Sequence, residues 1–449
     1  MDNYLFNEFR EISAPEWKQK IQVDLKGADY NDTLLWKTDD RITVKPFYTK
    51  EDRTNTKIET SEKGFVVCQS IYIENEEKSN SFAIDSLKRG AKSIEFKAKN
   101  KFNYKAILKD LDLKNTIFYF NLKFIDADFT IELSDYIKSK NCYFNIDIIG
   151  NLASSGNWFT NLTDDHKELE RIVNKTNNSI CINTSVYQNA GANITQQLAY
   201  ALAHANEYLN HFGSKIVNKI HFNFSVGSNY FFEISKLRAF RVLWESLLKE
   251  YDIKNNKTHL FVLPSLRNKT LYDYNVNMLR TTSECMSAIL GGADTVSNIS
   301  YDDFFHHSNE FGERISRNQL LILQQESELS EAQNFANGAY YIESITHQLS
   351  QNALEVFKTI EKGGGFLKQL KEGIIQRKIK ESANKEQQKF DSGEIVLLGS
   401  NKLQNDKDSM KNDLELFPFS KIRNDQTLIQ PIIQKRLAEK LEQKRLHDE

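Results

Sequence analysis

FNFSVGSNYFFEISKLRAFRVLW, residues 222–244, is the stretch that decides the fold of this 449-residue chain. Apolar and polar residues alternate over residues 220–226, which is the period of a strand with one apolar and one polar face. Residues 227–229, Gly-Ser-Asn, interrupt the alternation, and apolar residues then recur at helical spacing from Ile234 to Leu247. The stretch therefore predicts a strand, a loop and a long helix, which is the repeating unit of α/β proteins.

The same unit recurs along the chain. Candidate strands cover residues 65–71, 93–97, 116–122, 143–148, 180–186, 220–226, 259–263 and 295–299. Helical patterns between them cover residues 81–89, 133–139, 166–174, 195–212 and 277–291. Eight strands separated by helices are the count of a (β/α)8 TIM barrel, an α/β fold. The alternative, a doubly wound sheet, would normally carry a glycine-rich turn after its first strand, whereas residues 74–77 here read Glu-Asn-Glu-Glu.

Composition excludes several classes of function. The net charge of −2 argues against a nucleic-acid partner, and no apolar run reaches the roughly 18 residues of a membrane-spanning helix. The four cysteines lack C-x-x-C spacing and the nine histidines lack metal-ligand spacing, so we expect buried thiols and no metal site. The first residues carry acids and lack the apolar core of a secretory signal. We therefore expect a cytoplasmic protein.

Three candidate strands carry a polar face. The polar residues are Asn145 and Asp147 on one strand, Asn183 and Ser185 on the next, and His221, Asn223 and Ser225 on the third. In a barrel the outer face packs on helices and is apolar, so these side chains should point into the lumen. One interpretation is a plug held together by hydrogen bonds and water. The other is a channel that admits an extended ligand.

The stretch at residues 229–244 resembles a barrel signature of the methylmalonyl-CoA mutase family, a helix of the form EIAKxRAxRxLW. Further motifs follow in the family's order: Asn-x-x-x-Arg-Thr-Thr-x-Glu before Leu-Gly-Gly within residues 275–292, Asn-Gly-Ala-Tyr-Tyr-Ile-Glu-Ser at 337–344, and linker features at 378–383, 391–394 and 399–402. The resemblance runs to about residue 430 and adds weight to the barrel. It also implies a lumen like that through which coenzyme A threads in catalytic members.

The catalytic elements of the family are not matched here. Where its catalytic members have Arg-Gln-Tyr-Ala-Gly, residues 67–71 read Val-Cys-Gln-Ser-Ile, which puts Ser70 at the place of the tyrosine. The place of the catalytic histidine falls on Val186, or on Gln188 if the register is shifted. Valine cannot donate a proton or a hydrogen bond, so the general-acid role is missing. We therefore expect no catalytic residue in this chain.

The resemblance implies three parts: an N-terminal arm at residues 1–63 that contacts another subunit, the barrel at 64–362, and a C-terminal linker and helical extension at 363–449. A helix in the arm should be capped by Ser13 or Ala14. The arm's aromatic residues, Trp17, Trp36, Phe47 and Tyr48, are expected to pack either on the barrel or on a partner. The cobalt-ligating motif Asp-x-His-x-x-Gly is absent after the barrel, so no cobalamin-binding domain is expected.

Together these features favour a small, non-catalytic subunit of a heterodimeric mutase. Its large subunit would bind adenosylcobalamin and interconvert (R)-methylmalonyl-CoA and succinyl-CoA. The alternatives are a barrel subunit that binds an acyl-CoA and works with a separate cobalamin-binding protein, and a stand-alone module for coenzyme A esters. Candidate residues for binding in the lumen are Asn145, Asn183, Ser185 and Asn223. Because polar side chains should fill the lumen, we expect coenzyme A to bind this chain weakly or not at all.

Overall fold

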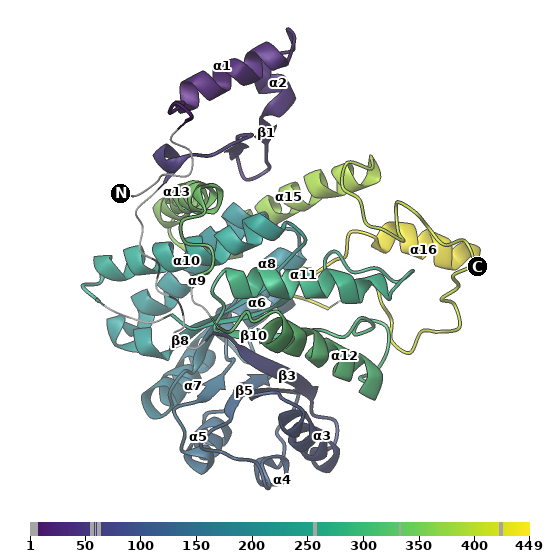
Figure 1. Cartoon of the computed structure of the whole chain (residues 1–449). Coiled ribbons are helices and arrows are strands. Elements are labelled where there is room, and N and C mark those ends of the chain that lie inside the picture. Colours follow the sequence, from purple (N-terminus) through teal and green to yellow (C-terminus); the bar gives the residue numbers. More distant parts are fainter. Residues whose placement is uncertain are drawn as a thin grey trace.

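A ring of parallel strands surrounded by helices forms the body of the protein (Figure 1). The computed structural model describes residues 8–53, 58, 60, 64–254, 258–331, 334–421 and 425–449. The barrel strands are β3 (Val66–Tyr72), β4 (Ser93–Ala98), β5 (Ile117–Leu122), β6 (Cys142–Phe144), β7 (Ile180–Asn183), β8 (Ile220–Val226), β9 (Leu260–Pro264) and β10 (Thr295–Ser297). They pair in the order β6-β5-β4-β3-β10-β9-β8-β7.

β6 and β7 are not paired as neighbouring strands, but two backbone hydrogen bonds close the ring between them. The N–H of Phe144 donates to the carbonyl of Asn178 at 2.8 Å, and the N–H of Cys181 donates to the carbonyl of Ile146 at 3.0 Å. Strand neighbours are therefore sequential around the ring, as in a (β/α)8 barrel. The predicted barrel is confirmed, and a doubly wound sheet is excluded.

The stretch that predicted the fold forms β8 and α10 (Tyr230–Glu250). Phe222 and Phe224 point outward from β8, and their rings lie 4.5 and 4.8 Å from the ring of Phe240 on α10. Trp244, one turn further along α10, lies 4.9 Å from Phe222. Such close aromatic pairs add to the free energy of burying the side chains and fix the helix against the strand.

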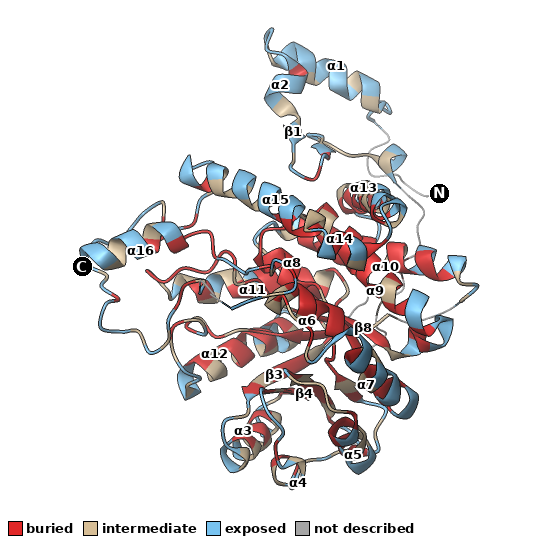
Figure 2. Ribbon diagram, turned by 180° about the vertical axis from the view of Figure 1, so that it is seen from behind, coloured by how far each residue is buried: buried red, intermediate tan, exposed pale blue. Residues whose placement is uncertain are grey.

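The other helices around and beyond the barrel are α3 (Glu76–Lys88), α4 (Tyr104–Ile107), α5 (Ala127–Ile137), α6 (Ile148–Ser155), α7 (Leu162–Lys175), α8 (Ser185–Asn189), α9 (Ile194–Phe212), α11 (Val276–Leu290), α12 (Glu310–Leu321), α13 (Tyr340–Lys362), α14 (Phe366–Lys371), α15 (Ile374–Asp391) and α16 (Glu439–Asp448), with short 3-10 or π turns η2 (Ser214–Lys219) and η3 (Ile322–Glu326). Figure 2 shows the buried residues gathered on the strands and on the inner faces of these helices. None of the helices in the described part of the chain is long and apolar enough to cross a membrane.

Two predicted strands extended at least three residues beyond the observed ones. The strand predicted at residues 143–148 ends at Phe144, because the side chain of Asp147 accepts a hydrogen bond from the N–H of Gly150 at 2.8 Å and caps α6. The strand predicted at 180–186 ends at Asn183, and α8 begins two residues later. Side-chain hydrogen bonds to the nearby backbone compete with strand pairing, which the alternation of residue types does not reveal.

The N-terminal arm comprises α1 (Ala14–Asp24), α2 (Tyr30–Leu34), the hairpin β1 (Trp36–Lys37) and β2 (Thr43–Val44), and the turn η1 (Lys50–Asp52). Ser13 caps α1 in a capping box with Glu16, as one of the two predicted caps. The second half of the arm packs on the barrel: the ring of Trp36 lies 5.7 Å from that of Phe232, and the ring of Tyr48 lies 5.2 Å from that of Tyr341. By contrast, α1 has no buried residue and projects from the body (Figure 1).

A buried carboxyl group in the hairpin loop anchors the arm. Asp40 is 8% exposed and accepts a hydrogen bond at 2.7 Å from the N–H of Thr195 in the first turn of α9. Its own carbonyl accepts a hydrogen bond from the amide of Asn352 on α13 at 2.9 Å. Burial raises the pKa of Asp40 to about 6, although the bond from Thr195 acts in the opposite direction.

The first prediction follows from this raised pKa. Asp40 binds its proton more tightly in the folded state than in the unfolded state. The resulting stabilisation is fully present below about pH 4, where Asp40 is protonated in both states, and it is lost as the pH rises through about 6. The shift from 3.8 corresponds to about 3 kcal/mol. We expect Asp40→Asn to become more stable relative to the native chain by up to that amount between pH 4 and pH 7, measured by urea denaturation. Asp24→Asn, at an exposed position of α1, is the control, and parallel pH profiles of Asp40→Asn and the native chain would contradict the prediction.

Residues 427–437, here called the C-terminal strap, cross the end of the barrel to which the carboxyl ends of the strands point. The N–H groups of Leu428 and Ile429 both donate to the carbonyl of Gly156 at the end of α6, and that of Ile432 donates to Ala153 at 2.7 Å. Further along, the N–H of Lys435 donates to Asn189 at the end of α8. A side chain at position 156 would collide with the strap, since a Cβ there would lie 2.7 Å from the carbonyl oxygen of Ile429.

Candidate functional site

A cavity of about 500 Å³ lies between the C-terminal ends of β5–β8 and the chain's own C-terminal segment. Its barrel side is formed by Asn121, Leu122, Lys123, Asn145, Asp147, Gly150, Asn151, Ser154, Ser155, Phe159, Cys181, Asn183, Val186 and Asn223, and its outer side by Ser420, Lys421, Pro431, Ile432, Ile433 and Gln434. The carboxyl ends of barrel strands are where the ligand sites of this fold lie. This cavity is therefore the candidate site.

The structure brings three of the four predicted binding residues together in the wall of this cavity: Asn145, Asn183 and Asn223. The fourth, Ser185, begins α8 and is not among the lining residues, and its hydroxyl is buried with no hydrogen-bond partner in the described structure. Sequence analysis missed the residues of the outer side, such as Lys421. Nothing in the sequence near them marks a site, since only the return of the chain across the barrel brings them there.

Asp147 lies in the cavity wall, but other groups already hold its carboxylate. One oxygen accepts hydrogen bonds from the hydroxyl of Tyr208 at 2.8 Å and the N–H of Gly150, and lies 2.9 Å from Nε2 of His204. The other accepts the N–H of Asn183 at 3.2 Å. Burial would raise the pKa of Asp147, but His204 and these donors outweigh it and hold the pKa below its ordinary value.

Below the cavity, the upper lumen is filled by a network around a buried carboxylate. Glu95 on β4 accepts hydrogen bonds from the hydroxyl of Ser70 at 2.6 Å and the amides of Asn121 and Asn145 at 3.2 and 3.4 Å. Lys97 lies 3.5 Å from the same carboxylate. Burial would raise the pKa of Glu95, but Lys97 and these donors outweigh it, so the pKa falls below its ordinary value and the group stays charged.

His221 continues the network on the far side of the lumen. Its Nε2 lies 2.8 Å from the amide oxygen of Asn145, which can only accept, so we assign the ring proton to Nε2. Burial, with His259 nearby, lowers the pKa of His221 well below its ordinary value, so the ring is neutral. Its Nδ1 and the amide oxygen of Asn223 are buried with no hydrogen-bond partner in the described structure. Each unpaired buried group of this kind costs about 1–3 kcal/mol.

The lower lumen is closed by packed rings. Tyr119 and Phe261 are buried with ring centres 4.8 Å apart, and Tyr143 stacks on Tyr119 at 4.9 Å. The hydroxyl of Tyr119 lies 2.8 Å from both Nε2 of His259 and the hydroxyl of Thr295. Burial raises the pKa of Tyr119 well above its ordinary value, so the hydroxyl keeps its proton. The lumen is thus polar above and aromatic below, and it is filled rather than open at this level.

The two positions that differ from the family's catalytic residues have distinct surroundings. Ser70, in the place of the tyrosine, is tied to Glu95 and lies 3.1 Å from the hydroxyl of Ser297, inside the lumen network. Val186 lines the cavity, whereas Gln188 turns away from it and accepts a hydrogen bond from Lys236 on α10 at 3.1 Å. Of the two positions considered for the histidine, Val186 therefore lines the cavity and Gln188 does not. An apolar side chain faces the cavity there.

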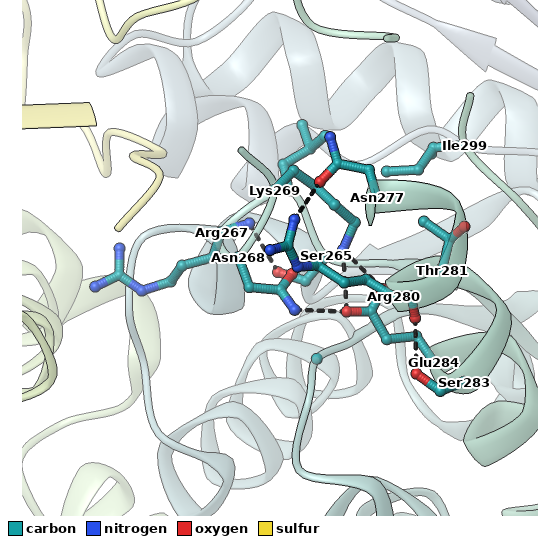
Figure 3. A network of polar contacts seen from close by, with 12 residues as sticks. Ser265, Arg267, Asn268, Lys269, Asn277, Arg280, Thr281, Ser283, Glu284 and Ile299 are labelled. Atoms are coloured by element: carbon teal, nitrogen blue, oxygen red, sulfur yellow. Dashed lines mark hydrogen bonds and ion pairs between the residues drawn. The ribbon is translucent and has the colours of Figure 1, made fainter. Parts of the chain in front are cut away.

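A second polar network, after β9, holds the rim of the barrel (Figure 3). The ammonium group of Lys269 lies 2.7 Å from the carboxylate of Glu284 on α11, and both side chains are 1% exposed. Asn268 donates to the same carboxylate at 2.6 Å, and Arg280 donates to Asn277 at 2.8 Å. The motif residues on α11 therefore fix the loop between β9 and α11 to the helix.

The C-terminal helix docks on this same loop. Glu442 of α16 accepts the N–H of Leu271 at 2.7 Å, and its other oxygen lies 2.7 Å from the guanidinium of Arg436. Arg436 in turn donates to the carbonyl of Lys269 at 3.0 Å. Buried charged side chains thus join the C-terminal segment to the rim of the barrel. The helix α16, in the expected C-terminal extension, therefore packs on its own chain along this face.

The family model for methylmalonyl-CoA mutase matches residues 143–446, about two thirds of the chain. The chain belongs to the methylmalonyl-CoA mutase family. The small subunit of this mutase from Porphyromonas gingivalis is 32% identical over 446 residues, which cover 89% of this chain and 71% of that protein. The family resemblance of the sequence is confirmed.

Matches to other members of the mutase family are shorter. Methylmalonyl-CoA mutase from Escherichia coli is 32% identical over 56% of this chain and 36% of its own length. The large subunit from Propionibacterium freudenreichii subsp. shermanii is 33% identical over 50% of this chain and 32% of its own length. The chain thus spans about a third of these relatives. Among solved structures, dihydropteroate synthase from Yersinia pestis aligns with a TM-score of 0.33 and 13% identity, covering 59% of this chain and 93% of that one, which is too distant to bear on function.

The residues of the cavity do not suit the cobalamin cofactor that the resemblance to the family implies for the complex. The lining of the cavity contains no histidine that could ligate cobalt, among the residues described. Across 8–53, 64–254 and the other described ranges, no cluster of three or more histidine, cysteine or acidic side chains could hold a metal ion. The strap also covers part of the face at the carboxyl ends of the strands.

Proposed function

We propose that this chain is the small, non-catalytic subunit of a heterodimeric methylmalonyl-CoA mutase in the cytoplasm. Its large subunit would bind adenosylcobalamin and interconvert (R)-methylmalonyl-CoA and succinyl-CoA. The observation that carries the proposal is the identity of two side chains, Val186 in the cavity wall and Ser70 in the lumen network. In the catalytic members that the sequence resembles, a proton donor stands at the first place and a substrate-binding tyrosine at the second. Neither side chain can do the work of the residue it stands for.

The filled lumen supports the same proposal. Coenzyme A could thread the barrel only by displacing Tyr119 and Phe261, which pack against each other at full burial. Moving large buried aromatic side chains costs several kcal/mol, of the order seen when such side chains are truncated. We also retain, as part of the proposal, the division into an arm at 1–63, a barrel at 64–362 and a C-terminal extension at 363–449.

The alternative, a subunit that itself binds an acyl-CoA, is favoured by one observation. The cavity at the strand ends is large enough for the acyl part of such a ligand and carries the amides of Asn145, Asn183 and Asn223. The two functions differ in where the pantetheine chain could go, because the lower lumen is closed by rings. Calorimetric binding of coenzyme A at micromolar concentration would favour the alternative.

Association with a large subunit can be tested by substitutions in the N-terminal arm. The apolar side chains of Ile12, Trp17 and Val23 on and before α1 are 58%, 48% and 72% exposed, and α1 buries none of its residues against its own chain. We expect Trp17→Ser combined with Val23→Ser to weaken binding of the large subunit by about 2 kcal/mol, or roughly thirtyfold, because buried tryptophans dominate interface energies. Surface plasmon resonance with immobilised large subunit measures the change.

The matched control is Leu403→Ser, which removes an apolar side chain that is 76% exposed but lies outside the arm. Its affinity should equal that of the native chain. The thermal unfolding of the arm variant alone should also match the native chain, since Trp17 and Val23 contribute little to its own core. Unchanged affinity of the arm variant would remove α1 from the interface.

A further inference from the structure

The cavity beneath the C-terminal segment has the chemistry of a ligand site that catalysis does not require. We propose that it binds a small phosphate monoester of a sugar or a nucleoside. Three observations carry the proposal: the charge of the cavity, the hydrogen-bonding capacity of its wall and its closure from below. It goes beyond the proposed function, because a non-catalytic subunit does not need a ligand at this position.

Two lysines give the cavity its charge. Lys123 follows β5, and Lys421 belongs to the C-terminal segment, and both line the cavity from opposite sides. Within the described residues, neither ammonium group has a hydrogen-bond or ion-pair partner. The carboxylates of Asp147 and Glu95 act on Lys123 only through space, because Asp147 is hydrogen-bonded to Tyr208 and lies beside His204, and Glu95 lies beside Lys97. Burial lowers the pKa of Lys123, although Glu95 and Asp147 act in the opposite direction. Two lysines against the one carboxylate of Asp147 leave the wall of the cavity with a net positive charge, which favours an anionic ligand.

The wall offers amide groups for the rest of a ligand. Asn121, Asn151, Asn183 and Asn223 all line the cavity, and Asn side chains donate and accept hydrogen bonds at once. The amide oxygen of Asn223 is the most telling, because this residue is 5% exposed and the oxygen has no partner within the described structure. A ligand hydroxyl donating to it would satisfy this oxygen. A phosphorylated polyol or nucleoside combines such hydroxyls with a dianionic group.

The shape of the site separates this ligand from a coenzyme A ester. Tyr119 and Phe261 close the lumen below the cavity, so a ligand must be held within about 500 Å³ between the barrel and the C-terminal segment. Cavities of this size hold small metabolites. Because Lys123 comes from the barrel and Lys421 from the C-terminal segment, a bound phosphate would also join the two.

The test uses the full chain and ribose 5-phosphate as the probe, with isothermal titration calorimetry at low ionic strength. We expect saturable binding, with Lys123→Ala and Lys421→Ala each weakening it by about tenfold. Asn223→Ala should weaken it by a smaller factor. Lys92→Ala, at an exposed lysine before β4 and outside the cavity, should bind as the native chain does. Hydrogen exchange of residues 427–437 should slow when the probe is bound, and at the same probe concentration it should slow less in Lys421→Ala.

Four comparison ligands test the chemical class of the ligand that the cavity binds. Ribose, inorganic phosphate, succinate and coenzyme A should each bind at least tenfold more weakly than ribose 5-phosphate. No saturable binding of ribose 5-phosphate, or equal binding by the Lys123→Ala, Lys421→Ala double variant, would overturn the proposal. Equal binding of inorganic phosphate would overturn the role of the hydroxyl groups, and tighter binding of succinate would overturn the phosphate. None of these results affects association with a large subunit, so this proposal and the proposed function fail separately.

Discussion

Glu284→Ala is expected to lower the free energy of unfolding by about 3–5 kcal/mol, because it leaves the ammonium group of Lys269 buried without its counter-charge. Lys269 and Glu284 are both 1% exposed and 2.7 Å apart. Asn268 donates to the same carboxylate and would also lose its partner. The loop after β9 should then loosen together with the helix that docks on it through Arg436. Urea denaturation followed by circular dichroism measures the loss.

The control is Glu245→Ala, which removes the carboxylate of an ion pair with Lys249 at 2.8 Å. Both of these side chains are more than 60% exposed, so the loss should stay below about 0.5 kcal/mol. The double variant Lys269→Met, Glu284→Leu replaces the buried pair by apolar groups and should recover most of the stability lost by Glu284→Ala. Equal losses for Glu284→Ala and Glu245→Ala would show that the buried pair does not support the rim.

The second large effect concerns turnover. With adenosylcobalamin and (R)-methylmalonyl-CoA, this chain alone should show no isomerisation above background. One well-placed proton donor contributes roughly 10²–10⁴ in rate, and here Val186 faces the cavity in place of that donor. Ser70 is tied to Glu95 and cannot serve as the tyrosine, and the cavity lining offers no histidine to cobalt among the residues described. Val186→His should not restore turnover, because the lumen remains closed by Tyr119.

A coupled assay of succinyl-CoA formation with purified chain measures this second prediction. Steady turnover that scales with the concentration of this chain, in a preparation free of any large subunit, would contradict it. The comparison with Val186→His separates the missing proton donor from the closed lumen. If that variant alone gained activity, the lumen would have to admit substrate after all.

The sequence predicted the elements whose pattern is local. The strand and helix at residues 220–250 have the two periods on which such predictions rest, and Phe222 and Phe240 meet as those periods require. The cap at Ser13 was equally visible, because a capping box is spelled out within four residues. The ends of β6 and β7 were not visible in the sequence. β6 ends early because the N–H of Gly150 donates a hydrogen bond to the side chain of Asp147, which begins a helix there.

The candidate site was only half visible in the sequence. Asn145, Asn183 and Asn223 stood out because polar residues alternate with apolar ones on strands. Lys421 and the strap could not be predicted, because they reach the cavity after about 200 further residues of chain beyond Asn223. The polar pattern also gave no sign of the aromatic lower lumen, because Tyr119 belongs to a strand, β5, that sequence analysis did not single out for its polar face.

We propose that this subunit supports catalysis without taking part in it. The most direct measurement is the kcat of the reconstituted complex of this chain with a methylmalonyl-CoA mutase large subunit, comparing the native chain with Ser70→Ala while complex formation is followed by size-exclusion chromatography. We expect a 1:1 complex and a kcat within about threefold of the native value, because Ser70 does not touch the reacting atoms. A loss of roughly a hundredfold in kcat with the complex intact would show that this barrel takes part in the chemistry.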